Sequence, residues 1–207
     1  MASDVSNISI IGAGHTRFGR LDENLEDLIT AAAREALTEA DLPAEAIDAV
    51  FVGHFNAGLV RDGFPSSLVH QVDPGLRFKP ATRLENACAS GSAAIHAGIT
   101  AILSGRAQTV LIVGAEKMTS RSTAEVTEAL AGAGYQNDPA EAALSFPGVF
   151  AQAAQQYTDR YRDPLGAMAQ IASKNHQNAM RNPLAQMQRS LTVEDCSNVS
   201  DKNPLIA

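Results

Sequence analysis

The chain has 207 residues, of which 45% are hydrophobic, and this is enough to bury the core of a globular domain. Its 16 basic and 23 acidic residues give a net charge of -7, which argues against nucleic acid or an anionic membrane as the main partner. The opening residues do not resemble a signal peptide, and no apolar stretch is long enough for a membrane span. With only two, widely separated cysteines, Cys88 and Cys196, a cytoplasmic, reducing location is expected.

Short apolar runs rich in β-branched residues predict four strands. Each run is bounded by Gly, Pro, Asn or Asp, and together they cover residues 7–11, 49–55, 81–84 and 109–113. Between the first two runs, apolar residues recur every three or four positions from Leu25 to Leu37, which predicts an amphipathic helix that ends near Pro43.

A second helix is predicted over residues 88–104. Its apolar residues cover nearly the whole circumference, and it is rich in Ala, Gly and Ser, so a central helix buried between layers is expected, ending at Gly105. Strands that alternate with helices predict an α/β domain with a mostly parallel sheet over residues 1–116. Residues 117–207 show no strand pattern and are predicted to form an α-rich domain, with helices near 147–161 and 164–180.

Cys88 is the strongest candidate for a catalytic residue. It lies in the segment ENACASGS at residues 85–92, between a predicted strand and the start of the predicted buried helix. A thiol attacks as its thiolate, which the N–H groups and dipole of a helix N-terminus favour. Ser90, Gly91 and Ser92 are small enough to let a thioester approach. A small core residue is the alternative interpretation of this cysteine.

No partner base can be assigned from the sequence. The candidates are His15, His54, His70, His96 and His176. His96 falls inside the predicted buried helix, where a histidine usually has a structural role, and none of the five lies in a motif that marks it as the partner of Cys88.

Three other patterns are candidate ligand sites. Gly12 and Gly14 follow a predicted strand, but Arg17 stands where a dinucleotide fingerprint needs its third glycine, so a tight turn is predicted instead. Residues 113–118 predict a turn at the carboxyl edge of the sheet, where α/β proteins bind ligands. No cluster of metal-ligating residues is present, so no metal is expected. The predicted α-rich domain is locally basic. Its cations either lie on a solvated surface or contact the phosphate groups of a nucleotide-like cofactor; they are Lys174, His176, Arg181 and Arg189.

The segment around Cys88 closely resembles the active-site segment of thiolases. The resemblance extends to residues 10–19, 113–118 and 174–183, which are similar to the sterol-carrier-protein-type branch that also includes acetyl-CoA acetyltransferases. It implies that this chain is the N-terminal half of a fold in which two similar halves stack into five α-β-α-β-α layers. Residues 1–116 would form the core of that half, and 117–207 its helical loop domain.

The resemblance implies a nucleophile's role for Cys88. Its thiolate would attack a 3-ketoacyl-CoA, release acetyl-CoA or propionyl-CoA, and pass the remaining acyl group to coenzyme A; the reverse is a Claisen condensation. Coenzyme A and acyl-CoA would be substrates in lipid metabolism, with no permanently bound cofactor. The expected protein partner is a second copy in a dimer or tetramer, or a complementary C-terminal half.

Two departures keep alternatives open. The family's second half carries an activating His and a proton-moving Cys in loops that this sequence lacks, and Cys196 has no matching context. The chain by itself is therefore expected to be unable to complete a turnover. One alternative is a non-catalytic thiolase-like subunit that binds acyl-CoA or a partner; another is a condensing enzyme that uses an acyl carrier protein.

Overall fold

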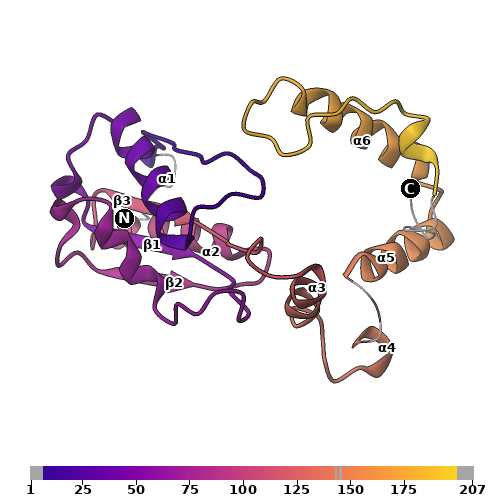
Figure 1. The fold of residues 1–207 in the computed structure, drawn as a ribbon, viewed down its shortest axis with the longest axis horizontal. Helices are drawn as coiled ribbons and strands as arrows, with labels where there is room; N and C mark the ends of the chain where they lie inside the picture. Colours follow the sequence, from indigo (N-terminus) through magenta and orange to yellow (C-terminus); the bar gives the residue numbers. More distant parts are fainter. Residues whose placement is uncertain (1–6, 143, 145, 200–207) are drawn as a thin grey trace. The chain divides into compact units, whose positions relative to one another are not determined.

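The computed structural model describes residues 7–142, 144 and 146–199. The chain divides into two compact units (Figure 1). The first comprises Met1–Thr16 with Arg20–Ser122, and the second comprises Arg17–Gly19 with Thr123–Ala207. The first unit contains a sheet covered by helices, whereas the described part of the second contains helices joined by loops.

Three parallel strands form the sheet of the first unit, in the order β2-β1-β3. The strands are β1 (Ala49–Gly53), β2 (Ala81–Leu84) and β3 (Val110–Gly114), and each confirms a predicted run to within two residues. In the centre, Val50 pairs with Ala81 on one side and with Leu111 on the other. All three carboxyl ends therefore lie at one edge of the sheet.

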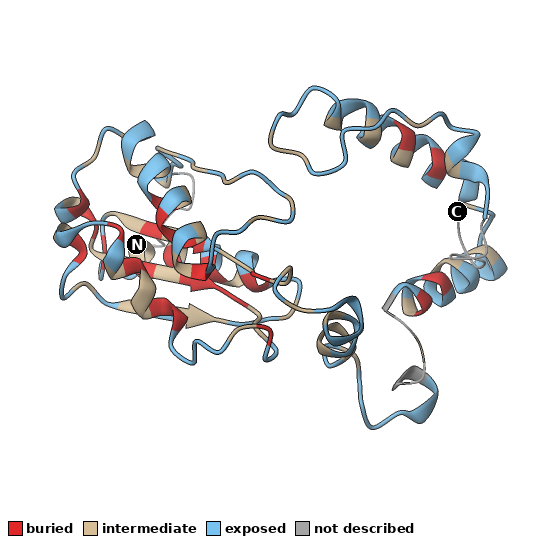
Figure 2. Ribbon diagram, in the orientation of Figure 1, coloured by how far each residue is buried: buried red, intermediate tan, exposed pale blue. Residues whose placement is uncertain are grey.

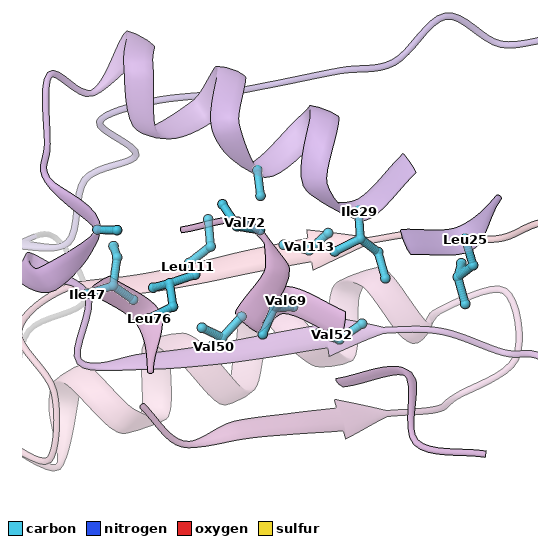
Figure 3. Close-up of a cluster of buried hydrophobic side chains, with 12 residues drawn as sticks. Leu25, Ile29, Ile47, Val50, Val52, Val69, Val72, Leu76, Leu111 and Val113 are labelled. Atoms are coloured by element: carbon cyan, nitrogen blue, oxygen red, sulfur yellow. The ribbon is translucent and has the colours of Figure 1, made fainter. Parts of the chain in front are cut away.

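Helix α1 (Leu25–Glu39) confirms the first predicted helix and covers one face of the sheet with three short 3-10 helices, η2 (Ala44–Ala46), η3 (Pro65–Gln71) and η4 (Pro74–Leu76). A capping box between Asn24 and Asp27 starts α1. Its apolar stripe packs with alternate residues of β1 and β3 into a core in which Ile29 and Val50 are fully buried (Figure 3). Burial of this stripe, more than local propensity, holds the helix in place.

Helix α2 (Ser90–Leu103) packs on β1 and β3 and contacts β2. Gly98 allows close contact with the sheet, since a Cβ there would lie 2.9 Å from Ile112 Cδ1. The expected burial on all sides is not met in this chain, because only Ser90, Ala94 and Gly98 are buried and Ile95 is 49% exposed (Figure 2). The apolar outer face of α2 has no covering layer among the described residues.

The predicted strand at 7–11 is wrong. These residues pair with no strand in the described chain, and Ile10 is 91% exposed. The turn predicted for Gly12 and Gly14 is also wrong, since residues 8–18 contain no turn and neither glycine has a left-handed φ. They permit close packing against α1 instead, because added Cβ atoms would lie 2.4 Å from Ala36 O and 2.0 Å from Ala32 O.

The second unit confirms both predicted helices, as α5 (Phe146–Arg160) and α6 (Leu165–Ala179). It also contains α3 (Thr123–Ala131), α4 (Pro139–Ala142) and the 3-10 helix η5 (Asp195–Ser197). The buried Ser173 of α6 donates a hydrogen bond of 2.8 Å to Leu191 O, which ties the following loop to the helix. Over the described residues, no helix is long and apolar enough to cross a membrane.

Candidate functional site

Cys88 lies in the turn that joins β2 to α2 at the carboxyl edge of the sheet. Strand β2 ends at Leu84 and helix α2 begins at Ser90, so the cysteine immediately precedes the helix N-cap, Ala89. Its side chain is exposed and its thiol is free. The strand, turn and helix predicted around Cys88 are confirmed. The N–H groups of Ala89 and Ser90 bond to carbonyls of the turn, those of Asn86 at 2.8 Å and Ala87 at 3.2 Å, and only the following N–H groups of the first turn rely on other partners.

The turn is held in a sterically costly conformation. Ala87 has φ +45°, in the left-handed region that non-glycine residues rarely adopt. The hydroxyl of Ser90, which is only 6% exposed, accepts from Asn86 N at 2.9 Å and donates to Ala87 O at 2.7 Å. Glu85 Oε1 also accepts from Ala87 N. These bonds fix the backbone on both sides of Ala87, directly before the cysteine.

Gly53, the last residue of β1, packs closely against the first residues of α2. A Cβ at this position would lie 2.8 Å from Ser90 O and 3.0 Å from Gly91 Cα, so only glycine lets the strand and the helix start come this close. Its partner across the sheet is Gly114 of β3, where an added Cβ would meet nothing within 4 Å. The close approach is thus specific to the position that faces Ser90.

The five candidate histidines make no hydrogen bond to the Cys88 thiol in the part of the chain that the structure describes. His54, His70 and His176 each direct Nδ1 at a backbone carbonyl, those of Ala115, Leu76 and Arg189, at 2.8, 2.9 and 3.1 Å. His96 lies on α2 and is exposed, and the backbone N–H of His15 donates to Glu35.

Glu116 has a role that the sequence did not reveal. Sequence patterns place it only in a predicted turn after β3, but its carboxylate accepts hydrogen bonds from Phe55 N at 2.9 Å and Asn56 N at 3.2 Å, in the loop after β1. Arg83 of β2 donates to His54 O at 2.9 Å and to Phe55 O at 2.8 Å. A side chain from β2 and another from just after β3 therefore bind the loop after the central strand.

Neither a metal centre nor a phosphate site is evident from side-chain geometry in the part of the chain that the structure describes. No group of three or more His, Cys, Asp or Glu side chains could hold a metal ion within the described ranges. The cations considered for phosphate contact lie on or just after α6, where Lys174, Arg181 and Arg189 are exposed. They belong to the second unit, whereas Cys88 belongs to the first.

Comparison with known proteins identifies the family to which this arrangement belongs. Residues 8–199 match the family described as "Thiolase, N-terminal domain". The chain belongs to the thiolase family. This confirms the resemblance inferred from the segment around Cys88, and it accounts for the parallel sheet with helices on both faces.

Curated relatives support the same branch of the thiolase family. An acetyl-CoA acetyltransferase of Methanothermobacter thermautotrophicus is 36% identical over 194 residues, which cover 93% of this chain and 50% of that protein. Sterol carrier protein 2 of Gallus gallus is 26% identical over 91% of this chain and 36% of that protein. This chain therefore spans about half the length of the first relative and a smaller share of the second.

A solved structure confirms the fold. The Ltp2-ChsH2(DUF35) aldolase superposes with a TM-score of 0.68 at 21% sequence identity, over 92% of this chain and 48% of that one. At this identity the likeness concerns the fold alone. The α/β thiolase-like N-terminal half expected from the sequence is thus confirmed.

Proposed function

We propose that Cys88 is the acyl-accepting nucleophile of a coenzyme A-dependent acyltransferase of the acetyl-CoA acetyltransferase type. The observation that carries the proposal is the exposed thiol in a strained, hydrogen-bonded turn at the start of α2. The acetyl-CoA acetyltransferase that is 36% identical to this chain supports the substrate class.

In the proposed reaction, the Cys88 thiolate attacks the ketone carbon of a 3-ketoacyl-CoA. The bond between C2 and C3 breaks, the acyl group stays on sulfur as a thioester, and the departing acetyl-CoA carbanion takes a proton from an acid. A second coenzyme A then attacks the thioester, and the thiolate returns. The N–H of Ser90 already bonds to Ala87 O at 3.2 Å, so the donors proposed for a developing oxyanion are the first-turn N–H groups that follow Ser90.

The base and the acid of this proposal are assigned to residues outside this chain, in the second half of the fold. Coenzyme A is a substrate in this proposal and not a resident cofactor.

Mass spectrometry of the complete protein after incubation with acetoacetyl-CoA tests the nucleophile. We expect an acetyl adduct on the peptide that carries Cys88, its loss in Cys88→Ser, and its retention in Cys196→Ser. An adduct found only on Cys196 would refute the assignment. A folded wild-type protein that binds acyl-CoA but shows no adduct would instead support a non-catalytic subunit.

A further inference from the structure

The loop after β1 has a strained backbone over three successive residues. Asn56, Ala57 and Gly58 have φ values of +65°, +44° and +82°, so all three lie in the left-handed region. Two of them carry a Cβ, and each such residue costs free energy that its surroundings must offset. Short-range bonds within the loop, such as that from Leu59 N to Asn56 O at 2.8 Å, contribute part of this stabilisation.

Side chains from distant parts of the chain supply further stabilisation. Glu116 accepts the N–H groups of Phe55 and Asn56, and Arg83 binds the carbonyls of His54 and Phe55. At the far end of the loop, Arg121 donates to Leu59 O at 2.9 Å. A carboxylate and a guanidinium therefore bind the same short stretch of backbone from its donor and acceptor sides, and charge-assisted bonds of this kind are stronger than neutral ones.

The same residues also fix the buried His54. Its Nδ1 lies 2.8 Å from Ala115 O and 3.5 Å from Glu116 Oε1, and because a carbonyl only accepts, Nδ1 carries the proton. Its Nε2 has no hydrogen-bond partner among the residues that the structure describes. Within that part of the chain, the ring is therefore held by the segment that contains Glu116.

This network leads directly to the turn of Cys88. His54 N donates to Leu84 O, the last residue of β2 before the turn, at 3.1 Å. Gly53, the residue before His54, makes the close approach to Ser90 and Gly91. A shift of the braced loop would thus be transmitted to both ends of the Cys88 turn, through the strand before it and through the helix after it.

We propose that Glu116 is a positioning residue for Cys88, which acts by bracing the 54–60 loop and the end of β1 against the start of α2. The inference rests on the proposed role of Cys88 as nucleophile. Glu116 touches neither the thiol nor the substrate in this role. Its loss would let the strained loop relax and would displace the sulfur from the geometry in which it attacks, an effect that can cost on the order of 10²-fold in rate for about 1 Å of misplacement.

The test compares Glu116→Ala, Glu116→Gln and a matched control in the complete protein. Asp48 provides the control, because its carboxylate also accepts two successive backbone N–H groups, those of Gln108 and Thr109, but at the amino end of β1. The rate of Cys88 alkylation by iodoacetamide is followed by peptide mass spectrometry across the neutral pH range, with Cys196 as internal reference, and the melting temperature of each variant is recorded.

We expect Glu116→Ala to slow alkylation of Cys88 by about tenfold or more and to change its pH profile, with Cys196 unaffected. Glu116→Gln should recover part of the rate, since one amide oxygen can still accept the Phe55 N–H. Asp48→Ala should lose stability but keep the wild-type rate. Equal slowing in Asp48→Ala, or a wild-type rate and profile in Glu116→Ala, would overturn the proposal.

The same samples are treated with acetyl-CoA to separate the two hypotheses. A wild-type protein that forms no acyl adduct on Cys88 contradicts the proposed function, while the alkylation rates still decide whether Glu116 positions the thiol. If Glu116→Ala does not fold, the test uses the single variants Glu116→Gln and Arg83→Lys instead. A wild-type alkylation profile of Cys88 in both variants would overturn the proposal that Glu116 positions Cys88 through the 54–60 loop.

Discussion

At the scale of single residues, Ser90 is the group whose loss should most directly disturb the Cys88 turn. Its hydroxyl bridges Asn86 N and Ala87 O, so Ser90→Ala removes two bonds from a backbone already strained at Ala87. We expect the free energy of unfolding to fall by about 1–3 kcal/mol and acylation of Cys88 to slow. Chemical denaturation and adduct formation measure the two effects.

Ser104→Ala is the matched control for this experiment. Ser104 caps the other end of α2, is exposed, and donates to Ala101 O at 3.0 Å. Its loss should change stability by no more than about 0.5 kcal/mol and leave acylation at the wild-type rate. Equal rates of Cys88 acylation in Ser90→Ala and Ser104→Ala would show that the two hydrogen bonds of the Ser90 hydroxyl do not affect the reactivity of Cys88.

The residue scale also shows where sequence reasoning succeeded and where it failed. The strand, turn and helix around Cys88 could be predicted because they are adjacent in the chain, so local patterns contain the information. The contact between Phe55 and Glu116 joins residues 61 positions apart, and no local pattern encodes it. The turn predicted for Gly12 and Gly14 failed because these glycines are required by a neighbouring helix and not by their own backbone.

At the scale of elements, the contact between β1 and α2 depends on Gly53. In Gly53→Ala the new Cβ would lie 2.8 Å from Ser90 O, so strand and helix must move apart. We expect a loss of about 1–3 kcal/mol of stability and slower alkylation of Cys88. Gly114→Ala, at the paired position of β3 with open space around its Cβ, should leave the alkylation rate unchanged. If both substitutions give the same rate, the close approach does not matter for the thiol.

The amino ends of β1 and β3 are joined by Asp48, and this link should respond to pH. The N–H of Gln108, and then that of Thr109, hold the pKa of Asp48 below its ordinary value of 3.8. As pH falls, the unfolded chain takes up this proton before the folded one does, so the stabilisation is complete above pH 3.8 and is lost as pH drops through the folded-state pKa.

Asp48→Asn should therefore flatten the acid limb of the stability curve. Urea unfolding at several pH values on either side of the ordinary carboxyl pKa measures how steeply the free energy of unfolding changes with pH. Asp41→Asn, in an exposed turn, controls for the change in net charge. A slope that is identical in wild type and Asp48→Asn would mean that the two N–H bonds do not persist in solution.

At the scale of the whole molecule, the outer face of α2 offers a test of whether a second half packs on this chain. Ile95 is 49% exposed here, so Ile95→Glu in the isolated chain should change stability by only about 0.5 kcal/mol. If a second half packs on this helix, the same substitution in the complete protein buries a charge and should cost several kcal/mol. Ala94→Glu, at a fully buried position, should unfold both.

Binding of a dye that recognises apolar surface gives an independent measurement. The isolated chain should bind it through α2 and the exposed Ile10, and the complete protein should not. A monomeric chain that melts cooperatively without binding dye would contradict the expected complementary half. The sequence predicted an apolar helix but not its exposure, because burial depends on residues that lie elsewhere.

The strand order also constrains how the first unit acquires its structure during synthesis. The central strand β1 pairs with β2 and β3, and both of these come later in the chain. When β1 leaves the ribosome it therefore has no partner, and its ladder with β3 can form only after Gly114 has emerged. Pairing between strands that lie this far apart in the chain is slow compared with helix formation. Nascent chains that stop before β3 should accordingly remain sensitive to protease, although α1 and its capping box are already complete.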